Sequence, residues 1–219
     1  IQQSGAGPYS MTELEKLLAD KRVSVTPFLG ELDEGFTSVG SAQDLETIFQ
    51  LVYLYATQPR LDPDVATRFG RAAEEYLKNR SLQPSTALDD KYLELMCGED
   101  PRCNHVTLTE RFVDVDPQRV LEVFQERFSD LDDAIVLLVG SFEIVEAKQL
   151  AQRYLGALPS TAADGEMWLD KRHPLPEGQI RETVYGGIEP RSEVRIYFTG
   201  PFTMTLENQV ALAMLTEVL

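Results

Sequence analysis

The chain has 219 residues, of which 43% are hydrophobic and 26% are charged. These are ordinary values for a folded globular domain and exclude a disordered or fibrous protein. Thirty-six acidic residues against 20 basic ones give a net charge of −16, which repels nucleic acids and anionic membrane surfaces, so we expect no nucleic-acid partner. The longest apolar run, Ala134–Gly140, is too short to cross a bilayer.

The first part of the chain predicts a helix followed by a hairpin. Ser10-Met11-Thr12-Glu13 is a capping box, and leucines follow it at helical spacing. Two strands are predicted at Arg22–Phe28 and Phe36–Gly40, and the acidic stretch Glu31–Gly35 is typical of the turn between them. The two strands are therefore expected to pair.

A run of helices is predicted next. Ser41 caps a long amphipathic helix, which ends before Pro59 because the residue before a proline avoids helical angles. Asp62-Pro63 and Asp116-Pro117 are each an N-cap followed by proline at the first helical position. A shorter helix is predicted from Pro84 to about Cys97.

The last part of the chain predicts a buried strand, a helix, a linker and a further unit. The apolar run within Asp132–Gly140 predicts a strand that is buried on both faces, and Glu143–Leu155 predicts a helix. Two more strands, at Ile180–Tyr185 and Glu193–Phe198, and a helix from about Leu206 follow a proline-rich segment. A strand followed directly by a helix suggests a sheet that is covered by helices.

The two cysteines lie close together in the sequence. Five residues, Gly and Pro among them, separate Cys97 from Cys103, so the chain can turn back and let them form a disulfide, as in an oxidising compartment. Two separate thiols are the alternative. A structural zinc site needs two closer cysteine pairs, so a metal site is disfavoured.

The side chains needed for catalysis are scarce. The two histidines, His105 and His173, are far apart and form no zinc-binding pair, and no Gly-x-Ser-x-Gly motif is present. The acidic clusters lack the spacing of a calcium loop. We therefore predict no catalytic and no metal-binding residues in the chain, and an independent enzyme that uses its own carboxylates has no support.

The order of these signals resembles the pitrilysin/insulinase-type zinc metallopeptidases, which include bacterial zinc proteases and mitochondrial processing peptidases. The segments that carry the resemblance are spread over nearly the whole chain: Ser4-Gly-Ala-Gly7, Leu14–Leu18, Asp44-Leu45-Glu46, Thr57-Gln-Pro-Arg60, Val115-Asp116 with Val120–Phe128, Ile135–Gly140, and Tyr154-Leu-Gly-Ala-Leu-Pro159.

The resemblance implies a non-catalytic repeat of a larger protease, with the α+β fold of the metallopeptidase-like (processing-peptidase) domain, a mixed or antiparallel sheet covered by helices. The family binds zinc through an inverted His-x-x-Glu-His motif, which this sequence lacks, so zinc is expected only in the parent's catalytic domain. Residues 1–158 would form the inactive peptidase-like domain, 159–178 a linker, and 179–219 the start of the next repeat, which could complete the first domain's sheet. Arg181 and Tyr185 only superficially match the family's substrate-binding Arg and Tyr and are not assigned that role.

The implied function is to help enclose peptide or unfolded protein and to support the zinc-bearing domain. The weakly predicted peptide contacts are Val23, Val25, Phe28, Glu31 and Glu34. The expected partners are the parent's catalytic domain, the peptide substrate and, for the isolated domain, a second copy. The alternative is a non-proteolytic assembly subunit resembling the respiratory-complex core proteins. The parents resembled are often periplasmic, which would suit a disulfide.

Overall fold

The computed structural model describes residues 1–30, 33–80, 84–98, 100, 116–128, 130–131, 133–160, 174–186 and 192–218. The chain divides into two compact units, one made of Ile1–Asn79 and Thr107–Asp170, the other of Arg80–Val106 and Lys171–Leu219.

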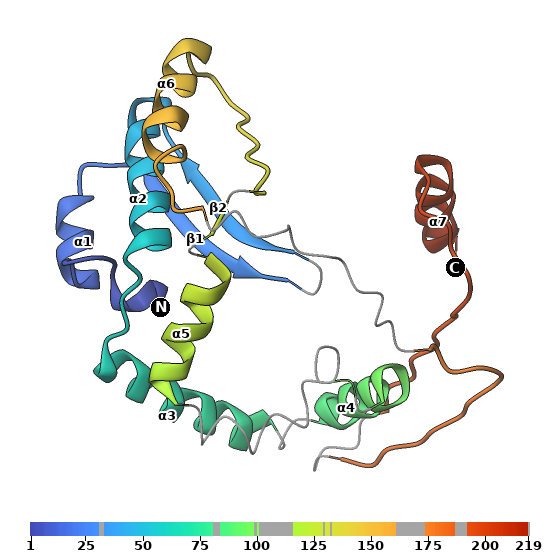
Figure 1. Cartoon of the computed structure of the whole chain (residues 1–219). Helices are drawn as coiled ribbons and strands as arrows, with labels where there is room; N and C mark the ends of the chain where they lie inside the picture. Colours follow the sequence, from blue (N-terminus) through green and yellow to red (C-terminus); the bar gives the residue numbers. More distant parts are fainter. Residues whose placement is uncertain are drawn as a thin grey trace. The chain divides into compact units, whose positions relative to one another are not determined.

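The first unit combines a two-stranded antiparallel sheet with helices (Figure 1). Its elements are η1 (Gln2–Ser4), α1 (Met11–Leu17), β1 (Val23–Leu29), β2 (Glu34–Gly40), η2 (Ala42–Asp44), α2 (Leu45–Thr57), α3 (Pro63–Arg80, whose last residue belongs to the second unit), α5 (Pro117–Phe128) and α6 (Ile144–Tyr154). The second unit contains α4 (Pro84–Cys97) and α7 (Leu206–Val218). The predicted α+β class is confirmed.

Local sequence signals explain where α1 begins. Ser10 and Glu13 form the predicted capping box: the Glu13 N–H donates to Ser10 Oγ at 3.4 Å, and the Ser10 N–H donates to Glu13 Oε2 at 2.8 Å. The preceding turn contains Gly5 and Gly7, with φ of 88° and 55°, a region that suits glycine. Ala6 between them is fully buried and bridges to Tyr9 and Pro59.

The sheet packs on α2 through one face. The register pairs Val23 with Gly40, Val25 with Ser38 and Pro27 with Phe36. Because side chains alternate between faces, these residues share the face that contacts α2. The buried cluster beneath it consists of Ala6, Leu14, Val25, Leu51 and Tyr55.

Two further contacts complete the first unit. A second buried cluster joins α2 to α6 and contains Leu45, Phe49, Ala147 and Leu150. The end of α5 reaches the sheet, where the Phe128 ring lies 5.2 Å from that of Phe36 and Arg127 forms an ion pair with Glu34.

Three predicted strands are wrong in this structure. Residues 133–140, 180–185 and 193–198 belong to no strand, and the run that was expected to be buried on both faces is open, with Ile135, Leu137 and Val139 exposed by 96%, 83% and 87%. The apolar pattern reports a tendency to pair, but a strand also needs a neighbour, and none is present for these segments in the described part of the chain.

In the second unit, residues 192–199 lie against α4. Arg195 forms ion pairs with Asp89 and Glu193, and the Tyr197 ring stacks on the Tyr92 ring with centroids 4.3 Å apart. The intervening residues Val194, Ile196 and Phe198 are exposed. Arg195 and Tyr197 therefore hold the segment against α4.

Candidate functional site

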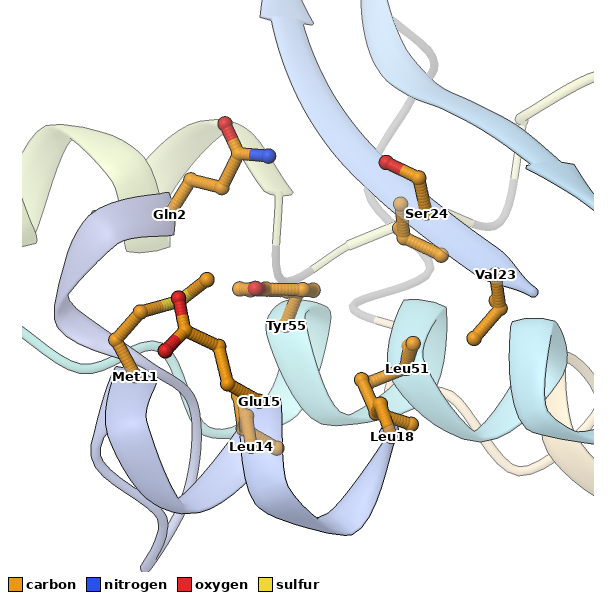
Figure 2. A pocket seen from close by; sticks show the side chains of 10 residues that line it. Gln2, Met11, Leu14, Glu15, Leu18, Val23, Ser24, Leu51 and Tyr55 are labelled. Carbon is orange, nitrogen blue, oxygen red and sulfur yellow. The ribbon is translucent and has the colours of Figure 1, made fainter. Parts of the chain in front are cut away.

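A groove of about 280 Å³ lies between α1, β1 and α2 in the first unit (Figure 2). Its walls come from Met11, Leu14, Glu15 and Leu18 of the α1 region and from Val23, Ser24 and Val25 of β1, and Gln2, Leu51 and Tyr55 complete it. Leu14, Leu51 and Tyr55 also belong to the buried cluster, so the packed core forms the floor of the groove.

The strand that lines the groove has an edge that pairs with no strand in the described part of the chain. Among the described residues β1 pairs with β2 and with no other strand. Just outside the paired residues, the Ser41 N–H donates to the Arg22 carbonyl at 2.9 Å, and the Gly30 N–H donates to the Asp33 carbonyl at 2.7 Å. In an antiparallel pair the two backbone groups of a residue point to the same side and alternate along the strand. The even-numbered residues of β1 therefore face β2.

The odd-numbered residues of β1 consequently point their backbone groups away from β2. Val23 and Val25 present an N–H and a carbonyl to this outer edge, beside the groove that both residues line. Pro27 follows in the same series, and its missing N–H fits an outward position, where no bond to β2 is lost. The groove thus adjoins a row of backbone donors and acceptors that can accept another extended chain.

The two ends of the groove differ in chemistry (Figure 2). At one end lie Leu18, Leu51 and Val23. At the other, called the acidic end below, lie Met11, Gln2, Glu15 and the hydroxyl of Tyr55. Gln2 Nε2 donates to Thr26 Oγ1 at 3.0 Å, which fixes the amide near the middle of β1. Burial raises the pKa of Tyr55, so its hydroxyl stays neutral and can donate a hydrogen bond.

The structure separates the predicted contact residues. Val23 and Val25 line the groove, but Phe28 is even-numbered and lies on the opposite face of β1, and Glu34 forms an ion pair with Arg127. Glu31 lies outside the described residues. A role for any of these five in peptide contact stays a prediction.

Sequence reasoning missed the helical side of the groove. Leu14 and Leu18 were recognised as the apolar stripe of a helix, but which strand that stripe would face is a tertiary property. Tyr55 and Glu15 gave no signal of their own, because a single tyrosine or glutamate in a helix is commonplace.

The remaining predicted residues lie in or near parts of the chain that are not described. Cys97 is buried at the end of α4, and its predicted disulfide partner Cys103 lies outside the described residues, so the pairing stays a prediction. His105 and His173 are also outside them. Within the described ranges, no three His, Cys, Asp or Glu side chains come together in a way that could hold a metal ion. No described helix combines the length and apolarity needed to span a membrane.

Comparison with known sequences relates the chain to a family of zinc proteases. Residues 114–219 match the family model described as the Peptidase M16 inactive domain. The whole chain is 20% identical to the probable zinc protease PqqL of Haemophilus influenzae, of which it covers 23%, and 53% of it is 31% identical to a zinc protease PQQL-like protein of Arabidopsis thaliana, of which it covers 12%. The chain thus spans less than a quarter of the length of these relatives.

Solved structures give the same fold. About three quarters of the chain (74%) superposes on 18% of the periplasmic protease PqqL from Escherichia coli, with a TM-score of 0.63 and 18% identity. The ferredoxin protease FusC, solved as a point mutant in complex with Arabidopsis ferredoxin, matches over 75% of this chain and 18% of its own, with a TM-score of 0.57 and 17% identity. A protease from Helicobacter pylori matches over 74% of this chain and 40% of its own, with a TM-score of 0.57 and 12% identity. The expected resemblance is confirmed: residues 114–219 match the inactive domain of the M16 peptidases, and the chain is similar to PqqL-type zinc proteases in sequence and in fold.

Proposed function

We propose that this chain is a catalytically silent domain of a PqqL-like zinc protease, which lines the peptide chamber and binds extended polypeptide along the outer edge of β1. The observation that carries the proposal is the groove itself, which adjoins the outward backbone groups of Val23 and Val25. Zinc and bond cleavage would belong to the catalytic domain of the parent protein, which this chain would support.

The physical basis is strand addition. An extended peptide laid beside β1 would gain main-chain hydrogen bonds at Val23 and Val25, which do not depend on its sequence. Its inward side chains would enter the groove above Leu51 and Tyr55 and lose contact with water. Such binding suits a substrate that is an unfolded polypeptide, because a folded protein offers few free strand segments.

The test compares two proline variants in a peptide-binding titration. Val23→Pro removes an N–H that faces the groove, whereas Ser38→Pro removes one from the outer edge of β2, and neither group bonds across the sheet. With a fluorescent seven-residue extended peptide, Val23→Pro is expected to abolish most binding and Ser38→Pro to leave it near the wild-type value. Equal binding by both variants would refute the edge as the site, and circular dichroism checks that both remain folded.

Catalytic silence is tested on the same chain. Incubated with zinc and a quenched fluorescent peptide, the chain is expected to bind the peptide without cleaving it. Cleavage that a chelator abolishes would show that a catalytic site had been overlooked.

The domain limits and a second copy as partner are further parts of the proposal. We propose that 1–158 is the inactive domain, 159–178 its linker and 179–219 the start of the next repeat.

The exposed side chains of Ile135, Leu137 and Val139 support self-association of the isolated chain. Leu137→Lys is expected to shift sedimentation from dimer to monomer; a wild-type monomer at high concentration would contradict this.

A further inference from the structure

We infer that the groove beside β1 prefers peptides in which a lysine or arginine stands two residues before a large apolar residue. This rests on the proposed function, since it assigns a sequence preference to the same groove. Three features carry the inference: the different chemistry of the two groove ends, the spacing of side chains in an extended peptide, and the direction of β1.

The acidic end of the groove offers one charge to a ligand. Glu15 is exposed and takes part in no ion pair with the described residues. The Gln2 amide nitrogen donates its hydrogen bond to Thr26, and the raised pKa of Tyr55 keeps its hydroxyl neutral. Glu15 is therefore the charged group among the residues that line the groove. A lysine or arginine side chain at this end would meet the Glu15 carboxylate and the Tyr55 hydroxyl, and its hydrocarbon stem could pack on Met11.

The opposite end of the groove suits an apolar side chain. Leu18, Leu51 and Val23 line it, and Leu51 is almost fully buried beneath. A leucine or phenylalanine placed here would be covered by hydrocarbon, and replacing it with serine should weaken binding about tenfold or more.

The size of the groove sets the separation of these two residues. Alternate side chains of an extended chain lie on one face, about 7 Å apart. The β1 residues that line the groove are Val23, Ser24 and Val25, one such repeat, and Gln2 contacts Thr26 just beyond them. One peptide side chain therefore falls at each end of the groove, two residues apart.

The direction of β1 sets their order. Antiparallel pairs are roughly two to three times as common as parallel ones, so we place the peptide antiparallel to β1. Because β1 begins at Val23, at the apolar end, and runs toward Thr26, at the acidic end, the peptide would pass the acidic end first. The basic residue then precedes the apolar one.

The test is a binding titration of the 219-residue chain with four peptides that differ in two positions. The first has the core Lys-Thr-Leu between flanking Ser and Thr residues, the second has Gln-Thr-Leu, the third has the reversed order Leu-Thr-Lys, and the fourth has Lys-Thr-Ser. The Lys-Thr-Leu peptide is expected to bind best, roughly two- to fivefold better than the Gln-Thr-Leu peptide, a gain in the range of one exposed ion pair, and about tenfold or more better than the Lys-Thr-Ser peptide.

Two charge variants distinguish the local effect of the Glu15 carboxylate on peptide binding from the general attraction of a basic peptide to a chain with a net charge of −16. Glu15→Gln is expected to erase the advantage of Lys-Thr-Leu over Gln-Thr-Leu, whereas Glu75→Gln, an exposed site on α3, removes the same charge and should preserve it. Equal effects of the two variants, or a preference for the reversed peptide, would overturn the inference. The Val23→Pro variant separates the sequence preference from the proposed function. If this variant abolishes binding but the four peptides bind the wild-type chain equally, only the sequence preference is refuted. If Val23→Pro leaves the binding of every peptide unchanged, the proposed function is refuted as well.

Discussion

The carboxylate of Asp44 accepts a hydrogen bond from the backbone N–H of Arg22 at 3.0 Å and so ties the start of β1 to the start of α2. The Ser41 hydroxyl donates to the same oxygen at 2.6 Å, and Lys21 lies 3.5 Å from the other. These bonds favour the ionised carboxylate, and the bond from Ser41 is the main cause that lowers the pKa of Asp44 below its ordinary value of 3.8.

Replacing Asp44 is expected to change how stability depends on pH. Because its pKa is lower in the folded chain, Asp44 stabilises the fold above about pH 3.8, and this contribution is lost as the pH falls through the folded-state value. Asp44→Asn should lower the urea midpoint of unfolding at pH 7. As the pH is lowered, the midpoint of this variant should fall less steeply than that of the wild-type chain. The control is Asp20→Asn, an exposed turn residue; an equal effect of the two variants would contradict this role.

The contact between α2 and α6 depends on buried hydrocarbon. Leu150 is 5% exposed and packs with Leu45 and Phe49. Leu150→Ala should lower the free energy of unfolding by about 2–5 kcal/mol, since it leaves a cavity. Ile144→Ala, on the same helix but 66% exposed, should cost about 0.5 kcal/mol or less. Urea denaturation measures both, and similar losses would mean that α6 does not dock as described.

The turn before α1 requires glycine at position 5. With φ at +88°, an added Cβ would collide with the carbonyl oxygen of Tyr9. Gly5→Ala is therefore expected to lower the free energy of unfolding by about 1–3 kcal/mol. Gly70→Ala, inside α3 where nothing lies within 4 Å, should instead stabilise the chain by roughly 0.5–1 kcal/mol. Thermal unfolding of the two variants gives the comparison, and a neutral Gly5→Ala would refute the strained turn.

The second unit offers a test of how residues 192–199 are held. Hydrogen bonds to Asp89 and Glu193 raise the pKa of Arg195, and the Tyr197 ring stacks on Tyr92. Tyr197→Ala should release the segment and speed tryptic cleavage after Arg195 several-fold. Tyr185→Ala, whose side chain is 92% exposed, should not change that rate. An unchanged rate in Tyr197→Ala would show that the stacking does not hold the segment.

Local signals predicted the helices and the hairpin well. The capping box at Ser10 and the proline at Pro63 both mark true helix starts, and the predicted strands Arg22–Phe28 and Phe36–Gly40 differ from β1 and β2 by at most two residues at either end. Each of these elements is specified by residues near one another in the sequence.

The failures share a physical cause. The run that contains Ile135 and Leu137 has the composition of a buried strand, but whether it pairs depends on a neighbour that its own sequence does not specify. The groove could not be predicted for a similar reason. Its two sides, Leu18 of the α1 region and Val23 of β1, were assigned separately, and only their packing against Leu51 brings them to one site.

The most direct test of the account is amide hydrogen exchange of the chain with and without a saturating extended peptide, read residue by residue by NMR. Strand addition predicts that the peptide slows exchange of the Val23 and Val25 N–H groups, which face the groove, and leaves that of Ser38, on the outer edge of β2, unchanged. Unchanged exchange at Val23 and Val25, or protection confined to the β2 edge, would contradict peptide binding at this groove.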